Sequence, residues 1–576
     1  MRRLVLLASH LLASDDKPPS KSYDDWPNSQ GFNTTYEERT PVELEVDGII
    51  PSWAAGTLYR SGTGHAEIKT EKNGTFKTRH WFDGLAIVHR FQILPPDQDH
   101  PAVRVVYNSR STCDGLIDQI QKTGDPRLMS FGRRYDPCRS FFQKIASVFR
   151  AMESPAPNEV SMSITLSASF PGLEKLEKKT SDQAPGRVRN LINKTDNSNL
   201  QSLDPETLEP IGLASQAILH PDLTGPFSAA HAKSDPVTGD VYNYNLQPGR
   251  KGTYRVFCVS ASTGKTSILA TISADASYLH SFCLTENYVV LCVWNSFYAA
   301  GGIGVLWNRN IMDALSYDPS RPARWYVVDR RPSEAGGRGL VASYTSDPFF
   351  CFHTVNAFEE KVDSTGKTDI LADMIIYNNL NCISEFYLEH LIGNHQSSSS
   401  AANSKYTTLL TRFRLPSLPP LDTRSCQPSK QAVIEVQSDL EEIFELPTLN
   451  PRYVTHPHRY IYGVRHTGSS TFFDGLVKYD AKRQTATYWK NPSQYAGEPI
   501  FIPRKQTNGD PLDNIDEDDG VLLSVVLDGT AGKSYLLVLD ARTMKEVARA
   551  SVKGAIGFGF HGTHVPSFEG EKALDF

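Results

Sequence analysis

The sequence predicts an all-β fold that forms a single domain, and two observations lead to that prediction. From about Thr40 onward, short runs of β-branched and aromatic residues are separated by Gly, Pro, Asp and Asn, which is the pattern of strands joined by turns. Repeated short strands of this kind are typical of a sandwich, a barrel or a propeller. No segment has the composition of a second domain. We therefore expect one β domain over residues 40–576, because all-β folds often exceed the usual domain size.

The individual elements follow from the same pattern. Strands are predicted for the apolar runs at 104–107, 240–245, 254–259, 288–294 and 521–527. The segments 235–240 and 528–532 have the composition of hairpin turns. The serine-rich segment 395–404 and the proline-rich segment 416–421 predict irregular loops. No repeat period emerges, so composition alone does not select a propeller among the all-β folds.

Residues 1–39 are predicted to form a flexible N-terminal tail. Two arginines precede a short apolar run at the start, which leaves a signal peptide open, although His10 interrupts the run. No other segment approaches the roughly 20 apolar residues that a membrane-spanning helix needs. We therefore expect a cytosolic protein.

Charge and cysteine content exclude several classes of protein. A net charge of -6 and the lack of a basic tract argue against a nucleic-acid-binding protein. The eight cysteines include no C-x-x-C pair, which disfavours a thiolate zinc site. Four of them lie in apolar, strand-like runs and suit a reducing compartment better than a disulfide framework: Cys258, Cys283, Cys292 and Cys351.

Four histidines stand inside strand-like blocks that are far apart in the sequence. They are His231, His280, His353 and His561. Neutral imidazole is the natural ligand of a divalent first-row metal, and only a fold can bring such distant residues together. A single histidine in a strand is more often an ordinary core or surface residue, so none of the four predicts a metal site by itself.

The blocks around these histidines resemble those of the carotenoid cleavage oxygenase family. The clearest match is Gly-Phe-His-Gly at 559–562, and Phe-His-Thr-Val-Asn stands at 352–356. Matches at 204–211 and 518–526 are typical of the family, and the resemblance spans the sequence from about residue 40 onward. The whole chain is most similar to fungal enzymes that cleave torulene or related carotenoids. The resemblance implies a seven-bladed β-propeller with a few helices and loops capping the metal face.

The resemblance also implies the roles of individual residues. It implies a non-haem Fe(II) ion held by the four histidines. Acidic residues orient such histidines in the family; Glu445 and Glu498 match two of these positions, and Asp196 stands where the family has a glutamate. Thr195 matches a threonine that crowds one coordination position and so directs dioxygen to another. Phe560 is expected in the wall of the substrate tunnel.

Other histidines offer competing ligand sets. His564 follows His561 by three residues, and because side chains alternate along a strand the two rings would point to opposite faces. His456 and His458 share one strand face and could bind a metal. Their motif does not match the ligand set of the family, so we expect them to be structural.

The implied reaction is cleavage of a conjugated double bond of an apolar polyene by dioxygen, with both oxygen atoms entering two carbonyl products. A stilbene-cleaving oxygenase and a retinoid isomerohydrolase share the iron site and stay open as alternatives. A non-catalytic propeller scaffold is an alternative of another class and would bind no iron tightly. We expect neither a nucleic acid nor an obligate protein partner.

One predicted helix lies at 137–150. Apolar residues recur there at helical spacing, namely Phe141, Phe142, Ile145, Val148 and Phe149. An amphipathic helix of this kind either caps the β core or dips into a membrane surface. The segment resembles the membrane-contacting patch of animal relatives, and a polyene substrate dissolves in lipid. We therefore expect peripheral contact with a membrane or a lipid droplet.

Overall fold

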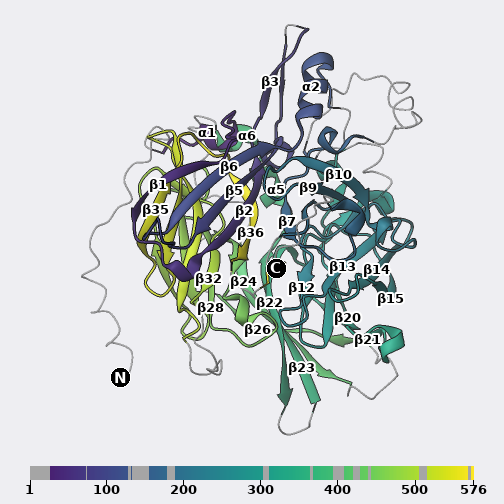
Figure 1. Cartoon of the computed structure of the whole chain (residues 1–576). Helices are drawn as coiled ribbons and strands as arrows, with labels where there is room; N and C mark the ends of the chain where they lie inside the picture. The colour runs from purple at the N-terminus through teal and green to yellow at the C-terminus, as the bar shows by residue number, and fades with distance from the viewer. Residues whose placement is uncertain are drawn as a thin grey trace, which may run out of the picture.

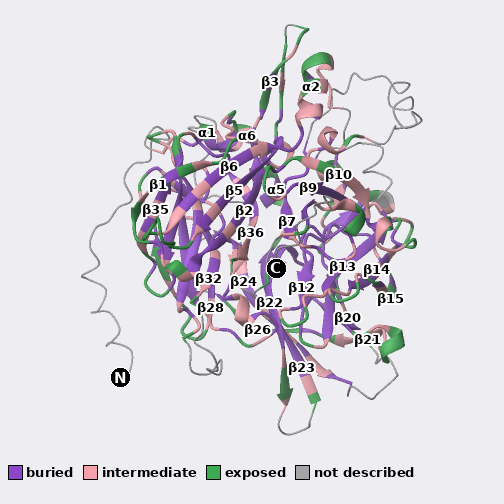
Figure 2. Cartoon of the chain, viewed as in Figure 1, coloured by how far each residue is buried: buried purple, intermediate pink, exposed green. Residues whose placement is uncertain are grey.

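The computed structural model of the protein is an all-β ring with few helices, as predicted. Figure 1 shows the sheets arranged around a centre at which β12, β22 and β36 lie, and Figure 2 shows buried residues along most strands. The described residues are 26–72, 74–126, 131–132, 155–177, 188–302, 310–362, 367–392, 408–419, 429–438, 443–504, 516–567 and 572–575.

Five sheets of four or five strands form separate blades. The first contains β7 (Thr165–Ala168), β8 (Leu191–Lys194), β9 (Asn199–Leu203) and β10 (Pro210–Ser215). The second contains β11 (Phe227–Ser228), β12 (Lys233–Ser234), β13 (Val241–Gln247), β14 (Gly252–Val259) and β15 (Thr266–Ala274). The third contains β16 (Cys283–Leu284), β17 (Tyr288–Val293), β20 (Ala323–Asp329), β21 (Leu340–Ser346) and β25 (Lys430–Gln431).

The other two separate blades follow along the chain. The fourth contains β22 (Phe350–Val362), β23 (Lys367–Tyr377), β24 (Thr408–Leu418) and β26 (Val433–Gln437). The fifth contains β27 (Ile443–Thr448), β28 (Tyr460–His466), β29 (Gly475–Asp480) and β30 (Thr485–Trp489). Each blade is built mainly from antiparallel neighbours along the chain, which is the architecture of a propeller.

Ten further strands form one continuous sheet. They are β31 (Gln494–Ala496), β32 (Ile500–Pro503), β33 (Gly520–Asp528), β34 (Lys533–Asp540), β35 (Lys545–Ser551), β1 (Val42–Gly48), β6 (Arg104–Ser111), β5 (Ala86–Leu94), β2 (Gly56–Thr63) and β36 (Gly559–Pro566). Strand β1 joins the two halves, because residues 45–48 pair with β35 and residues 42–44 pair with β6. The structure therefore shows five separate blades rather than the seven that the family resemblance implies.

Short elements complete the described part of the chain. Two-stranded sheets are formed by β3 (Glu67–Lys69) with β4 (Thr75–Lys77) and by β18 (Phe297–Tyr298) with β19 (Leu315–Ser316). The α-helices are α1 (Ser29–Phe32), α2 (Asp114–Thr123), α5 (Asn381–Glu385) and α6 (Leu388–Leu391). No helix among these residues is long and apolar enough to span a membrane.

The predicted strands and turns are confirmed almost throughout. The runs at 104–107, 254–259 and 521–527 fall in β6, β14 and β33, and the runs at 240–245 and 288–294 match β13 and β17 except for Asp240 and Trp294. In the predicted turn at 235–240, the Asp235 carboxylate accepts hydrogen bonds from the backbone N–H groups of Val237 and Thr238 at 2.7 and 2.6 Å, which closes the chain reversal before β13. The loop prediction is wrong for residues 416–418, because they continue β24.

Three further predictions concern the N-terminal tail, the serine-rich loop and the helix at 137–150. Residues 1–25, the serine-rich segment and the helix expected at 137–150 lie outside the described residues. The tail prediction is wrong for residues 26–39, because Phe32 is buried edge-on against Phe472 and Phe558, with ring centroids 5.0 and 4.8 Å away. Aromatic packing therefore fixes the chain well before residue 40.

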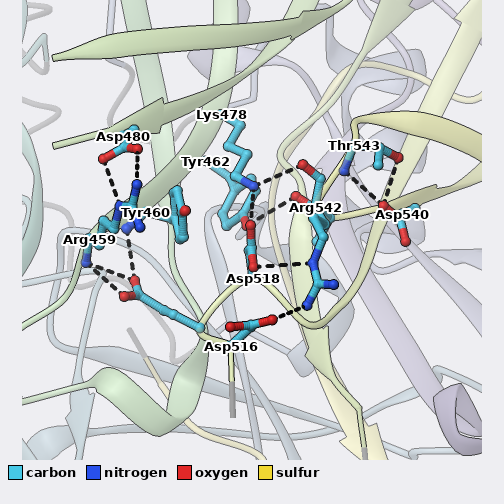
Figure 3. Close-up of polar contacts among 12 residues, drawn as sticks. Arg459, Tyr460, Tyr462, Lys478, Asp480, Asp516, Asp518, Asp540, Arg542 and Thr543 are labelled. Atoms are coloured by element: carbon cyan, nitrogen blue, oxygen red, sulfur yellow. Dashed lines mark hydrogen bonds and ion pairs between the residues drawn. The ribbon is translucent and has the colours of Figure 1, made fainter. Parts of the chain in front are cut away.

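A buried ion network ties the fifth blade to the ten-stranded sheet (Figure 3). The Nζ atom of Lys478, on β29, lies 2.6 Å from a carboxylate oxygen of Asp518 and donates to the backbone carbonyl of Arg542 at 2.9 Å. Arg542 lies in the turn between β34 and β35 and pairs with Asp516 at 2.6 Å. Glu517 accepts two backbone N–H donors where β28 begins. Residues 516–518 thus connect the start of β28 and strand β29, both in the fifth blade, with the turn between β34 and β35.

Candidate metal centre

The structure brings the four candidate histidines together near the ring axis. His353 lies on β22 and His561 on β36, whereas His231 lies between β11 and β12 and His280 precedes β16. One nitrogen from each ring belongs to a group of four that lie within 4.8 Å of one another. All four side chains are buried. Four different sheets therefore supply one imidazole each.

Three carboxylates hold the outer nitrogen of three of these rings. Nδ1 of His280 lies 2.8 Å from Asp196, Nδ1 of His353 lies 2.5 Å from Glu445, and Nδ1 of His561 lies 2.7 Å from Glu498. A carboxylate accepts a hydrogen bond, so the proton of each ring is on Nδ1 and the Nε2 lone pair points inward. The three acids named from the sequence therefore stand at three of the four histidines.

Asp196 reaches His280 although its side chain is one methylene shorter than glutamate. Its two carboxylate oxygens are placed by the backbone N–H of Ala230 at 3.3 Å and by the hydroxyl of Tyr278 at 2.9 Å. Asp196 also follows directly after β8 and Thr195, so the backbone itself delivers the carboxylate to the ring. The shorter acid can therefore orient His280 in this protein.

Three further side chains support the carboxylates, and none of them was assigned a role from the sequence. Arg60, on β2, donates to Glu498 at 2.7 Å, and the hydroxyls of Tyr278 and Tyr377 donate to Asp196 and Glu445. Arg60 and Tyr377 lie outside the blocks around the four histidines, whereas Tyr278 stands two residues before His280. Arg60 reaches Glu498 only because β2 pairs with β36, so tertiary structure alone reveals its role.

The arrangement fits a divalent cation. The Nε2 atom of His561 lies 3.0 Å from that of His231 and 3.2 Å from that of His353. Two nitrogens about 2.1 Å from one metal and at right angles would lie about 3.0 Å apart. Burial, followed by the neighbouring imidazoles, holds the pKa of His231 and of His561 well below the usual value, so both rings are neutral ligands.

The charges around the cluster also fit a divalent cation. Burial alone would raise the pKa of Glu445, but His353 and the hydrogen-bond donors around the carboxylate lower it below the usual value. Burial raises the pKa of Glu498 to about 7, against the opposing effect of Arg60. When all three carboxylates are ionised, they exceed the single guanidinium by two negative charges. A divalent cation would neutralise that excess.

The competing histidines lie elsewhere. His458 is buried and His564 is half-buried, and neither belongs to the group of inward-facing nitrogens. His458 Nε2 lies 3.1 Å from Asp373, and its Nδ1 lies 3.1 Å from the side-chain amide of Asn356. His456 Nδ1 contacts the backbone carbonyl of Val454 at 3.0 Å. These contacts give His456 and His458 structural partners.

An apolar cavity of about 210 Å³ opens beside the cluster. Its lining includes three of the histidines, His280, His353 and His561, and both Thr195 and Phe560 contribute to its wall. Aromatic side chains supply much of the remaining lining, among them Trp81, Phe82, Phe131, Phe352, Phe386 and Phe473. Such a cavity suits an apolar molecule, and it places that molecule directly against the histidines.

Replacing Glu445 with glutamine is expected to weaken metal binding by about 10- to 100-fold, because Glu445 orients His353 and increases the basicity of its ring. Titration of the metal-free protein with Fe(II) or Co(II) measures this change. The matched control is Glu359→Gln, since Glu359 lies with His353 on β22 but bonds to Thr285 and Asn287. Equal affinities for both variants and the unchanged protein would contradict the role of Glu445.

Comparison with known proteins places the chain in a family. Residues 31–566 match the family model described as retinal pigment epithelial membrane protein. The chain is 41% identical to a carotenoid dioxygenase of Neurospora crassa, over 95% of this chain and 92% of the relative. It is 39% identical to a torulene dioxygenase of Gibberella fujikuroi, over 95% of both chains.

A solved structure shows the same fold. A mutant of the apocarotenoid oxygenase of Synechocystis superposes with a TM-score of 0.69 at 22% identity, over 95% of this chain and 99% of the other. The predicted resemblance is thus confirmed by matches that run along nearly the whole chain, and the protein belongs to the retinal pigment epithelial membrane protein family of carotenoid oxygenases.

Proposed function

We propose that this protein is a non-haem Fe(II) dioxygenase that cleaves a conjugated double bond of a carotenoid, with torulene or a related polyene as substrate. The observation that carries the proposal is the aromatic cavity that ends against His280, His353 and His561. The torulene and carotenoid dioxygenases among the relatives support the substrate class. A polyene offers no polar group, so apolar walls are what its recognition requires.

The residues of the chain have distinct tasks in this proposal. The four histidines would hold the iron through neutral Nε2 atoms, and Asp196, Glu445 and Glu498 would keep the protons on Nδ1. Ferrous iron, when bound, supplies the reduced metal that dioxygen chemistry needs. The aromatic walls exclude water and hold the polyene in place.

Two wall residues define where the substrate and dioxygen sit. Thr195 adjoins Asp196 and lines the cavity, so its side chain would restrict one approach to the metal and leave the other for dioxygen. Phe560 packs on Trp81 and Phe82, with ring centroids 4.5 and 5.5 Å away, and would hold the polyene beside the cluster. Both roles belong to the proposal.

We further propose that the ring is a seven-bladed propeller. Within the ten-stranded sheet, β1 divides its pairing between two halves, so counting each half as a blade gives the seven blades of the family resemblance.

The segment expected to contact lipid, 137–150, comes shortly after cavity-lining residues in the sequence. Pro126 and Phe131 line the cavity and precede this segment. A cytosolic enzyme that docks on a membrane or lipid droplet could take up a lipid-dissolved polyene there, without an obligate protein partner.

The test is anaerobic loading with Fe(II), followed by aerobic incubation with torulene, β-carotene and resveratrol in detergent micelles. Mass spectrometry of the products identifies the cleaved bond, and ¹⁸O₂ shows whether both oxygen atoms are incorporated. We expect an iron-dependent aldehyde from a carotenoid and none from the His353→Ala variant, which lacks one ligand. Cleavage of resveratrol alone would assign the enzyme to stilbenes, and failure to bind iron would overturn the proposal.

A further inference from the structure

A second, smaller chamber lies on the ring axis next to the histidine cluster. Its volume is about 50 Å³, and it shares His353 and His561 with the apolar cavity, so these two rings separate the two spaces. His231 lines the chamber but not the apolar cavity. The rest of its wall comes mainly from strands that face the axis, including β7, β22, β27, β32 and β36. A water molecule needs roughly 10–15 Å³ of such space, so the chamber can hold water.

Residues 572–575 close this chamber on the axis. Leu574 and Asp575 form part of its lining, and Asp575 also borders a cavity of about 20 Å³ that is lined by Ser234 and other residues of β12, β16 and β22. Asp575 and Ser234 exchange two hydrogen bonds of 3.1 Å, one from each backbone N–H. Figure 1 shows the end of the chain marked at the centre of the ring, near β12 and β22. The segment thus lies between two spaces on the axis.

A buried ion pair fixes this segment in place. The Nζ atom of Lys194 lies 3.5 Å from a carboxylate oxygen of Asp575, and the two side chains are only 4% and 9% exposed. The hydroxyl of Ser167 donates to the same oxygen at 2.6 Å and also contacts the ammonium group. A buried ammonium group without an anion is strongly unfavourable. Lys194 therefore favours the conformation in which Asp575 occupies the axis.

We propose that residues 572–575 form an axial plug that keeps bulk water and dissolved chelators from reaching the histidine cluster along the axis. Leu574 supplies the apolar part of the plug, and Asp575 anchors it through Lys194, Ser167 and Ser234. The inference rests on the proposed metal centre. With the plug in place, substrate would reach the cluster through the apolar cavity alone. Water would then have less access to the cluster and to the competing reactions it allows.

The test measures how fast the iron-loaded enzyme releases Fe(II) to excess ferrozine under anaerobic conditions. In the absence of dioxygen a carotenoid is not cleaved, so saturating β-carotene can fill the apolar cavity during the measurement. We expect Asp575→Ala to release iron about tenfold faster or more, because loss of a buried pair favours the open axis. The increase should persist with β-carotene bound, since the axial route is separate.

Two further variants separate plug opening from misfolding. The double variant Lys194→Met/Asp575→Ala leaves no unpaired charge, so we expect it to fold normally. It still lacks the Asp575 carboxylate that anchors the plug, so its iron release should stay fast. Asp516→Ala is the matched control, because it makes the same substitution at an aspartate that does not line the chamber and that pairs with Arg542 through a side chain 73% exposed. Its release rate should equal that of the unchanged protein.

The outcomes distinguish the plug from the proposed function. Release rates equal to that of the unchanged enzyme in both Asp575 variants would overturn the plug while leaving the metal centre intact. An increase that β-carotene abolishes would also overturn it, because the iron would then leave through the apolar cavity. If the unchanged protein binds no iron at all, the proposed function and the plug fail together.

Discussion

Replacing Arg60 with methionine is expected to destabilise the folded protein by about 3–5 kcal/mol, because it leaves the Glu498 carboxylate buried without its cationic partner. The side chains of Arg60 and Glu498 are 3% and 8% exposed, and their atoms lie 2.7 Å apart. Solvent therefore cannot replace the lost guanidinium. Urea unfolding of the metal-free protein measures the change in free energy.

The double variant Arg60→Met/Glu498→Gln separates stability from metal binding. With both charges removed, no unpaired ion is left in the core, so most of the lost stability should return. His561 would still lack its carboxylate, so metal affinity should stay about 10- to 100-fold below that of the unchanged protein. A double variant that is as unstable as Arg60→Met would show that packing around Arg60, rather than charge, causes the loss.

Replacing Asp518 with alanine is the second change with a large expected effect. Lys478 and Asp518 have side chains only 7% and 10% exposed, and the remaining acceptor for the ammonium group would be the carbonyl of Arg542. Loss of one partner from such a buried pair costs about 3–5 kcal/mol. The urea midpoint of Asp518→Ala should therefore fall, with the sheets on either side of this pair separating more easily.

Asp516→Ala is the matched control in the same segment. Asp516 also pairs with an arginine, but its side chain is 73% exposed and that of Arg542 is 50% exposed. An exposed pair of this kind contributes about 0–1 kcal/mol. Equal losses of stability in the two variants would mean that burial does not determine the strength of the network in Figure 3.

Local composition was enough to predict the strands. The run 288–294 is apolar throughout, and 521–527 is apolar except for Ser524; the structure buries nearly all of these residues within sheets. The family blocks were equally informative for the cluster, since the four histidines and three acids named from the sequence all lie within one site. Each of these signals lies within a few consecutive residues.

Other features could not be predicted, because they depend on residues distant in sequence. Phe32 packs on aromatic residues more than 400 positions away, so a polar-looking segment is held against the ring. The pairing of β1 with two partners, which merges ten strands into one sheet, likewise depends on long-range register. The roles of Tyr278 and Tyr377 also depend on the fold, because it places their hydroxyls against the carboxylates of Asp196 and Glu445.

The sequence by itself determined the all-β class, the positions of five strands, the family and the set of histidines and acids at the centre. Only the tertiary structure decided how the centre is completed: Arg60 beside Glu498, a short Asp196 that still reaches His280, and Asp575 on the axis beside Lys194. The physical reason is that charge and hydrogen-bond partners act over a few ångströms in space, whereas local patterns record only neighbours along the chain.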